Sequence, residues 1–543
     1  MLKFASAFVL GLLAGPTVAV NYTEPFRPQY HFSPAKHWTN DPAGLFYYDG
    51  TYHMFFQYNP GGIEWGNMSW GHATSKDLTH WDEQPVALLA KGYPNNVTEM
   101  YFTGSAVADV NNTSGFGTDG KVPLVAIYTS YYTVTQTLPS GKRVHKDQQS
   151  QSIAYSLDNG MTWTPYDSVN PVIHYPPPPY HSQYKNFRDP FVFWHDQTQR
   201  WILVTTLAEL HKLVIWTSDN LKDWTVLSEF GPYNGVGGVW ECPNLFPLPV
   251  DGDGDENMTK WVMVVGLNPG GPPGTVGSGT QYFIGNFNGT AFIPDADTIY
   301  PGNKTANWMD WGPDFYAAAA YNGLPKEDHV QLAWMNNWQY GEHIPTHPWR
   351  SAMAIPRHLS LKNIDSKTTL VQQPHVNWKS IKGKHAYTRF WKSVDEGITD
   401  LGPLGKTLAI DITFSTPKDA GSQTFQFGIV VQATEDLSQH TRVGYDFQSQ
   451  QVFLDRTHSG IVSFDKTFPT VYNTTLAPCS DGEVRLQLLV DWSSVEVFGG
   501  EGEKTVTAQI FPNEEATHVE LFSTGGSTGN VKVEIWDVSS IWN

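Results

Sequence analysis

The sequence predicts an all-β fold, in which blades of β-sheet around a common axis precede a β-sandwich. Short β-like runs such as YHMFFQY, RWILVTTL and KWVMVVGL alternate with clusters of Gly, Pro, Asn and Asp, and stretches with a helical period are scarce. Similar segments end at Trp81, Trp163 and Trp224, at intervals of about 60 to 80 residues, as expected for one hairpin reused in each blade. From about Lys384 the chain alternates with period two between closely spaced turns, which favours a sandwich.

Four segments are expected along the chain. Lys3, the apolar run from Phe4 to Ala14 and the small residue Ala19 are typical of an export signal over residues 1–19. The texture changes after Arg350, so we expect the propeller at residues 20–355, a linker at 356–384 and the sandwich at 385–543. A chain of 543 residues is too long for one ordinary domain, which agrees with two folded units.

The composition narrows the classes of function. A formal net charge of −19 has the wrong sign for nucleic acid or an anionic membrane, and we expect neither as a partner. After the export signal, no run approaches the roughly 18 apolar residues of a membrane-spanning helix. We therefore expect a secreted, extracellular protein. N-linked glycans are expected on acceptor motifs that begin at Asn21, Asn67, Asn96, Asn111, Asn112, Asn257, Asn288, Asn303 and Asn473.

Three acidic residues stand in unusual surroundings. Asp41 lies in HWTNDPAG, Asp189 in FRDP and Glu241 in WECPNLF. Each is close to an apolar or aromatic run, where an unpaired carboxylate is costly, so each needs a partner or a task. One such residue alone is as consistent with a cap or a salt bridge as with catalysis, whereas three together favour catalysis. The acidic run from Asp251 to Thr259 lacks the spaced glutamate of a calcium loop and is expected to be a surface turn.

Glycosidic bond cleavage uses acids of this kind. One carboxylate attacks or stabilises the developing cation, and a second, with a raised pKa, protonates the leaving oxygen. Trp240 and Cys242 are expected to desolvate Glu241 and keep it protonated. Arg188 is expected to keep Asp189 ionised, and the amide of Asn40 is expected to hold a charged Asp41. The separation of Asp41 and Glu241 distinguishes a retaining from an inverting reaction.

Six short sequence blocks resemble those of a known protein family. HWTNDPAG, FQYNP, FTGSA, FRDP, WECPNLF and SSVEVFGG occur in this order across nearly the whole mature chain. With these blocks the chain closely resembles glycoside hydrolase family 32, which comprises invertases, inulinases, levanases and fructosyltransferases. Longer runs such as GLNPGGPPGTVGSGTQYF are most similar to the secreted exo-inulinases of filamentous fungi. The resemblance implies a five-bladed β-propeller followed by a β-sandwich, a retaining mechanism through a fructosyl-enzyme, and no cofactor or metal.

The resemblance also implies roles for individual residues. Asp41 corresponds to the nucleophile, Glu241 to the acid and then base, and Asp189 to the stabiliser of the transition state. The fructose pocket is implied to contain Asn40, Gln57, Trp65, Thr103, Arg188 and Trp338. The implied activity is the release of terminal β-D-fructofuranosyl residues from sucrose, inulin and levan.

Departures from the family pattern flank the proposed nucleophile. Thr39 replaces a methionine and Ala43 an asparagine, and Thr103 stands where serine is usual. An amide at position 43 could order a water or orient a carboxylate, so its loss keeps open sucrose-dependent fructosyl transfer of the 1-kestose type beside hydrolysis. Restoring asparagine at position 43 is expected to raise the share of hydrolysis.

Two other classes compete with this interpretation. A related five-bladed family cleaves arabinose or xylose polymers by inversion with a similar trio of acids, and activity on arabinan distinguishes it. A catalytically inactive sugar-binding protein is the other alternative, and sucrose binding without turnover supports it. Finally, Cys242 and Cys479 leave one disulfide bridge or two free thiols open.

Overall fold

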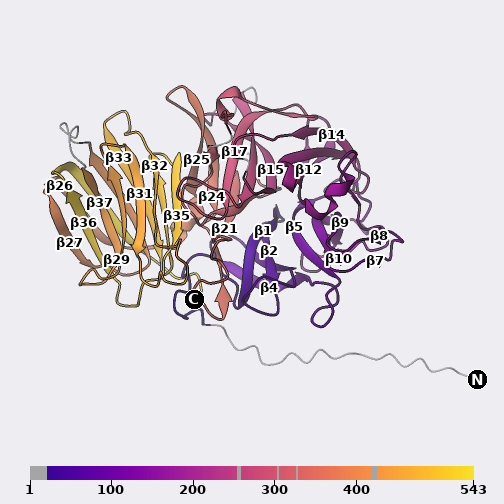
Figure 1. Ribbon diagram of the computed structural model, residues 1–543, viewed down its shortest axis with the longest axis horizontal. Coiled ribbons are helices and arrows are strands. Elements are labelled where there is room, and N and C mark those ends of the chain that lie inside the picture. The colour runs from indigo at the N-terminus through magenta and orange to yellow at the C-terminus, as the bar shows by residue number, and fades with distance from the viewer. Residues whose placement is uncertain are drawn as a thin grey trace, which may run out of the picture.

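The computed structural model describes residues 21–235, 237–252, 258–302, 305–325, 328–416 and 425–542. Two all-β units lie side by side: five sheets arranged around an axis, and two larger sheets packed face to face (Figure 1). The expected export signal at 1–19 and the acceptor residues Asn257 and Asn303 lie outside the described residues.

The first three blades are antiparallel sheets. Blade 1 consists of β1 (His37–Tyr48), β2 (Thr51–Asn59), β3 (Ser69–Ser75) and β4 (Trp81–Leu88), with β22 (Trp349–Arg350) parallel to β1. Blade 2 consists of β5 (Glu99–Ala108), β6 (Leu124–Tyr132), β9 (Gln149–Ser156) and β10 (Thr164–Pro165). A small hairpin, β7 (Gln136–Thr137) and β8 (Arg143–Val144), is inserted between β6 and β9. Blade 3 consists of β11 (Phe187–His195), β12 (Arg200–Leu207), β13 (Lys212–Ser218) and β14 (Thr225–Phe230).

The last two blades complete the propeller. Blade 4 consists of β15 (Val239–Pro249), β16 (Thr259–Asn268), β17 (Gly279–Phe287) and β18 (Phe292–Pro294), with β19 (Asn307–Trp308) beside β17. Blade 5 consists of β20 (Tyr316–Ala320), β21 (Val330–Met335), β24 (Arg357–Ile364) and β25 (Lys367–Pro374), with β23 (Ala352–Met353) beside β21. Short 3-10 helices are η1 (His181–Asn186), η2 (Ala208–Leu210), η4 (Ala296–Thr298) and η5 (Val376–Ser380).

The first strands of the blades form a closed ring. β1 contacts β5, β5 contacts β11, β11 contacts β15, β15 contacts β20, and β20 contacts β1. β22, which follows β21 of blade 5 in the chain, pairs with β1 of blade 1 and joins the two ends of the propeller. Residues far apart in sequence therefore meet where these five strands surround the axis.

The second unit is a sandwich of two six-stranded sheets. One sheet consists of β26 (Lys382–Val394), β37 (Thr528–Val538), β28 (Leu408–Ser415), β33 (Glu483–Asp491), β34 (Ser494–Gly499) and β35 (Lys504–Gln509). The other consists of β27 (Gly397–Pro403), β36 (His518–Thr524), β29 (Gln426–Ala433), β30 (His440–Asp446), β31 (Gln451–His458) and β32 (Val471–Thr475). Apolar residues on the facing sides, including Ile410, Phe427 and Val533, form one buried core.

The range expected to be a linker differs in the structure. Residues 357–374 form β24 and β25, the outer strands of blade 5, and η5 then leads into β26 of the sandwich. Many side chains of these two strands are polar and partly exposed, because outer blade strands face solvent on one side. In β24 buried residues alternate with partly exposed ones, as expected for an antiparallel strand with one solvated face.

The propeller and the sandwich are joined by buried charges. Glu496 in β34, within the SSVEVFGG block, accepts hydrogen bonds from Arg357 Nη2 (2.6 Å) and the backbone N–H of Ile355 (2.9 Å), and lies 2.9 Å from His31 Nε2. Arg357 also pairs with Asp310 at 3.0 Å, and all of these side chains are buried. The Glu496 carboxylate of the sandwich is therefore bound almost entirely by groups of the propeller and the segment that precedes it.

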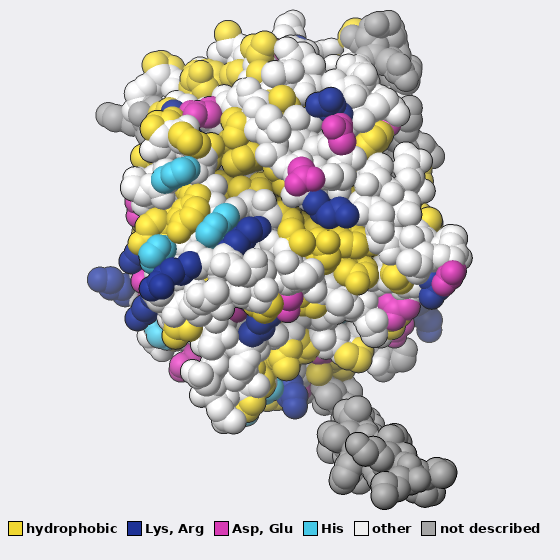
Figure 2. Space-filling model, turned by 90° about the vertical axis from the view of Figure 1, so that its right-hand side faces the viewer, with side chains coloured by type: hydrophobic (Ala, Val, Ile, Leu, Met, Phe, Trp, Pro, Cys, Tyr) yellow, Lys and Arg dark blue, Asp and Glu magenta, His cyan; other side chains and the backbone are white. Residues whose placement is uncertain are grey.

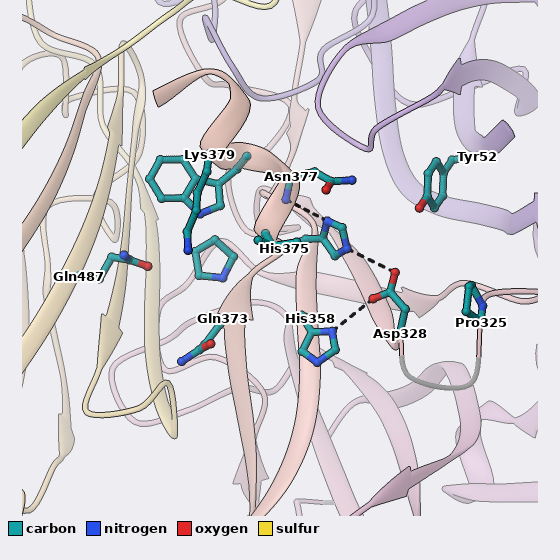
Figure 3. Close-up of a pocket in the computed structure, with 12 residues that line it drawn as sticks. Tyr52, Pro325, Asp328, His358, Gln373, His375, Asn377, Lys379 and Gln487 are labelled. Carbon is teal, nitrogen blue, oxygen red and sulfur yellow. Dashed lines mark hydrogen bonds and ion pairs between the residues drawn. The ribbon is translucent and has the colours of Figure 1, made fainter. Parts of the chain in front are cut away.

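A large pocket of about 750 Å³ lies at this junction (Figure 3). Its lining combines residues from blades 1 and 5, from η5 and from the sandwich, among them Tyr52, Gln373 and Gln487. Asp328 lies 3.3 Å from His358 Nδ1 and 3.3 Å from His375 Nε2, and these contacts hold its pKa below the usual range although burial opposes them. None of the three acids singled out in the sequence lines this pocket.

Candidate active site

The three acids come together on the propeller axis from three different blades. Asp41 lies in β1, Asp189 in β11 and Glu241 in β15, each on the innermost strand of its blade. The contacts run from Glu241 to Arg188 (2.9 Å), from Arg188 to Asp189 (3.7 Å), and from both aspartates to the thiol of Cys242. Asp41 and Glu241 are 200 positions apart in sequence. They meet in one acidic cluster because the inner strands of the five blades close into a ring.

A β-bulge occurs at this point in every blade. The register shifts between Thr39 and Pro42, Phe102 and Gly104, Arg188 and Phe191, Glu241 and Asn244, and Tyr316 and Ala319. A bulge twists the strand and redirects a side chain, and bulges occur often beside active sites. Here the bulged residues include Asn40 with Asp41, Thr103 and Asp189, so the same distortion aims side chains at the axis in successive blades.

Prolines accompany three of these bulges. Pro42, Pro190 and Pro243 follow Asp41, Asp189 and Cys242 directly, and all three line a narrow cavity of about 20 Å³ on the axis. Proline has no N–H for the strand ladder and is tolerated in a sheet mainly at edges and bulges. The recurring pattern of a functional side chain followed by proline is thus the local sequence signal of the bulge.

Asp41 is held by three donors. It is 8% exposed and accepts hydrogen bonds from Asn40 Nδ2 (3.0 Å), Thr103 Oγ1 (3.0 Å) and Cys242 Sγ (3.5 Å). The indole N–H of Trp38 donates to Asn40 Oδ1 at 2.7 Å, which turns the amide nitrogen of Asn40 toward Asp41. Burial, and then the charge of Glu241, raise the pKa of Asp41 to about 6, while the three donors oppose this change.

Asp189 has a strained and buried backbone position. Its φ is +61°, outside the range that most residues adopt, and its N–H donates to Thr129 Oγ1 at 2.9 Å. The backbone N–H of Cys242, itself at φ +49°, donates to Asp189 Oδ2 at 3.0 Å. Burial raises the pKa of Asp189 to about 7, against the opposing effects of Arg188 and the Cys242 N–H.

Arg188 acts on the pKa of Asp189 in the expected direction, but burial outweighs this effect. Arg188 makes its direct hydrogen bond to Glu241, at 2.9 Å, and reaches Asp189 only at 3.7 Å. Gln149 and Asn186 accept hydrogen bonds from the same guanidinium and fix its position. Adjacency in sequence indicated the weaker of the two acidic partners of Arg188, and the direct hydrogen bond to Glu241 was missed.

The surroundings of Glu241 also differ from the expectation. Trp240 is fully buried in the apolar core with Phe230 and Phe283, and Cys242 faces the two aspartates. Neighbours in a strand project to the opposite face, so neither side chain encloses the Glu241 carboxyl group. Instead Glu241, 17% exposed, lies between Arg188 and the hydroxyl of Tyr316, which donates a short hydrogen bond to Oε2.

The residues expected in the fructose pocket lie around this cluster. Trp338 packs against Trp38 and Trp334, with ring centroids 5.9 and 4.9 Å away, and forms an aromatic wall. Trp65 is 40% exposed and contacts Phe102, the neighbour of Thr103, edge to face at 6.0 Å. Gln57 is buried, and its Nε2 has no hydrogen-bond partner among the described residues.

The departures at positions 39 and 43 lie apart from the carboxylates. Thr39 Oγ1 donates to the carbonyl oxygen of Gln57 at 3.1 Å. Ala43 is fully buried in an apolar cluster that includes Phe55 and Trp70. The side chains that hydrogen-bond to Asp41 are those of Asn40, Thr103 and Cys242, and the effect of an asparagine at position 43 stays a prediction.

Sequence reasoning missed several residues of the site. Tyr316 bonds Glu241, Thr129 bonds Asp189, and Cys242 contacts both aspartates with its thiol. Cys242 and Cys479 are not bridged. The Cys-Pro pair was the available signal for Cys242, whereas nothing local distinguishes Tyr316. Among the described residues, no group of three or more His, Cys, Asp or Glu side chains is arranged to hold a metal ion.

A propeller with an acidic trio and an aromatic wall on its axis defines a sugar-cleaving class of enzyme. Residues 31–374 match the glycosyl hydrolases family 32 N-terminal domain, and residues 377–537 match the family 32 C-terminal domain. The chain belongs to glycosyl hydrolase family 32.

Individual proteins agree with this assignment. The extracellular exo-inulinase of Aspergillus ficuum is 65% identical over 544 residues, with 100% of both chains covered. The crystal structure of exo-inulinase from Aspergillus awamori has a TM-score of 0.93 and 65% identity, covering 96% of this chain and 100% of that chain. The β-fructofuranosidase of Schwanniomyces occidentalis complexed with fructosyl-erythritol has a TM-score of 0.81 and 31% identity, covering 96% and 99%.

Proposed function

We propose that the protein is a secreted, retaining β-fructofuranosidase that releases terminal β-D-fructofuranosyl residues from sucrose, inulin and levan. The observation that carries the proposal is the continuous set of contacts from Glu241 through Arg188, Asp189 and Cys242 to Asp41 on the propeller axis. The similarity to exo-inulinases over the full length supports the substrate class.

In the first step Asp41 is the nucleophile. A carboxylate oxygen of Asp41 bonds to the anomeric carbon of fructose as the bond to the leaving oxygen breaks, and the Glu241 carboxyl group gives its proton to that oxygen. Three donors hold the Asp41 carboxylate at the bottom of the site, and Glu241 is the more exposed of the two. The nucleophile Asp41 is therefore the inner of the two acids, and the proton donor Glu241 lies nearer the leaving group of the substrate.

In the second step water replaces Asp41. Glu241, now ionised, takes a proton from water, whose oxygen attacks the same carbon and releases fructose and the free carboxylate of Asp41. Tyr316 and Arg188 hold the ionised Glu241 in place, because both are hydrogen-bond donors to its two oxygens. They are therefore positioning residues for the acid and base.

The remaining pocket residues bind the sugar. Asp189 accepts hydrogen bonds from fructose hydroxyls and stabilises the cationic transition state. The unpartnered Nε2 of Gln57 supplies a donor that a sugar hydroxyl satisfies. The aromatic faces of Trp65 and Trp338 cover the apolar side of the ring.

The protein acts outside the cell. The export signal expected at residues 1–19 agrees with the extracellular location in the names of the Aspergillus exo-inulinases. No helix in the described residues is long and apolar enough to cross a membrane. Asn96, Asn111, Asn288 and Asn473 are exposed, and we propose that they carry N-linked glycans.

The deciding experiment follows products with time in concentrated sucrose and, separately, in inulin. Equal glucose and fructose from sucrose, with fructose alone released stepwise from inulin, is the expected result. Glucose in large excess with a new trisaccharide would instead identify a fructosyltransferase. Binding of sucrose without any product would leave a sugar-binding protein, and release of arabinose from arabinan would identify the inverting class.

A further inference from the structure

A partly exposed surface of aromatic and polar side chains continues from the fructose pocket over blade 2. Phe102, beside Thr103, stacks on Tyr131 with ring centroids 4.9 Å apart and planes 10° apart. The hydroxyl of Tyr131 donates to Asp147 Oδ1 at 2.9 Å, and Lys185 Nζ lies 3.2 Å from the other Asp147 oxygen. This series of side-chain contacts thus begins at the edge of the fructose pocket and reaches η1.

The series continues outward with rings. His145 and Tyr184 have centroids 5.8 Å apart, Tyr184 and Tyr175 6.3 Å, and Tyr175 and His181 5.8 Å. We call the set Tyr131, His145, Asp147, Tyr175, Tyr184 and Lys185 the outer surface. Figure 2 looks at the side of the molecule where Figure 1 shows β7, β8 and β14, and histidine, basic and hydrophobic side chains gather on its left-hand part.

The outer surface is attached to the reaction site by the chain itself. Lys185 and Tyr184 immediately precede Asn186, whose Oδ1 accepts a hydrogen bond from Arg188 at 2.9 Å, and Arg188 contacts Glu241. The inserted β7–β8 hairpin carries His145, and His174 Nε2 lies 3.0 Å from the backbone oxygen of Arg143 in that hairpin. Blades 1, 3 and 4 have no such hairpin between their strands among the described residues.

We infer that the outer surface binds the fructosyl residues that follow the terminal one in a fructan chain. The inference rests on the proposed function, because it concerns the part of the substrate that extends beyond the pocket. A substrate whose terminal residue fills the axial site must extend past Glu241. Glu241 is linked to the outer surface through Arg188 and Asn186, the residue that directly follows Lys185. Sugar rings offer apolar faces that pack on aromatic rings, and hydroxyls that bond to Asp147, Lys185 and the histidine.

The test compares substrates of increasing length. Tyr184→Ala and His145→Ala are assayed on sucrose, on short fructo-oligosaccharides and on inulin, with Phe390→Ala on the sandwich surface as the control. Phe390 is 62% exposed and lies in β26 of the sandwich, outside the propeller. We expect kcat/KM on inulin to fall about three- to tenfold for each outer-surface variant, mainly through KM. We expect the sucrose value and the Phe390→Ala variant to stay unchanged.

Each outcome separates the two proposals. A growing loss with chain length and unchanged sucrose turnover supports the outer surface. Equal losses on sucrose and inulin, or no loss on either, would overturn it while sucrose turnover by the unaltered protein still supports the proposed function. No turnover of any β-fructoside by the unaltered protein would overturn both. His145 is exposed, so His145→Ala keeps the test valid if the half-buried Tyr184 proves necessary for folding.

Discussion

The axis of the propeller and its junction with the sandwich both bury several carboxylates, but the two regions differ in how many cations contact these carboxylates. On the axis, three carboxylates share one nearby guanidinium, that of Arg188. At the junction every one of these buried acids contacts a cation directly: Asp310 and Glu496 share Arg357, His31 contacts both Asp491 and Glu496, and Asp314 meets Arg456.

The consequence is visible in the pKa values. Burial raises the pKa of Asp41 to about 6 and that of Asp189 to about 7. Burial acts on Glu496 in the same direction, yet Arg357 and His31 outweigh it and lower the pKa of Glu496 to about 2. Burial alone therefore does not determine the charge of an acid. Three acids around one cation make a reactive site at the cost of stability, whereas a set in which every acid contacts a cation holds two domains together.

The largest expected effect is on catalysis. Asp41→Asn is expected to lower kcat by more than about a thousandfold, because the amide cannot form the fructosyl-enzyme. The same variant is expected to keep or increase thermal stability, since it removes a buried charge that the folded protein disfavours. Initial rates on sucrose and a thermal melt measure the two effects. A variant that unfolds at lower temperature would contradict the contrast between the regions.

The junction is expected to show the reverse pattern. Glu496→Gln is expected to lower the free energy of unfolding by about 3–5 kcal/mol, because Arg357 and His31 then lack a buried counter-charge. The folded fraction is expected to keep its kcat on sucrose. Urea denaturation measures the loss, with the exposed Glu435→Gln as a control that leaves stability within about 0.5 kcal/mol.

The pH dependence of stability is expected to have opposite signs in the two regions. The pKa of Glu496 is lowered, so its stabilisation is full above its unfolded pKa and is lost as the pH falls toward 2. The pKa of His31 is raised to about 9, so its stabilisation is full below about 6.5 and is lost as the pH rises through 9.

For Asp189, whose pKa is raised to about 7, stability is lost as the pH rises from about 4 to 7. Relative to the unaltered protein, Asp189→Asn should therefore gain roughly 2–4 kcal/mol over that interval, and Glu496→Gln should show its largest deficit near pH 5 to 6. Denaturation curves at several pH values measure both. A stability difference for Asp189→Asn that stays constant with pH would show that this carboxylate is ionised throughout.

The smallest expected effect concerns one hydroxyl. The hydrogen bond from Thr103 Oγ1 lowers the pKa of Asp41, so Thr103→Val should move the acidic limb of the kcat/KM profile upward by up to about one pH unit. Thr103→Ser keeps the hydroxyl and should leave that limb in place. If both variants shift it equally, the methyl group and not the hydrogen bond controls Asp41.

The sequence by itself determined the class of fold and the identity of the acids. Period-two alternation, turn residues and recurring tryptophan-ended segments depend on neighbours along the chain, so they predicted blades and a sandwich without tertiary information. The pairs Asp41-Pro42 and Asp189-Pro190 coincide in the structure with bulges, which are local features of a strand. The strands at 357–374 were missed because the change in texture after Arg350 suggested the end of the propeller, whereas the two outer strands of blade 5 still follow it.

Only the tertiary structure decided which group each acid meets. Arg188 turns to Glu241, Cys242 turns to both aspartates, and Tyr316 arrives from the fifth blade. The Glu496 of a block that identified the family lies at the domain junction, outside the site. The physical reason is that pairing of charges depends on distance in space, and the closed ring of five inner strands brings together residues that no local pattern relates.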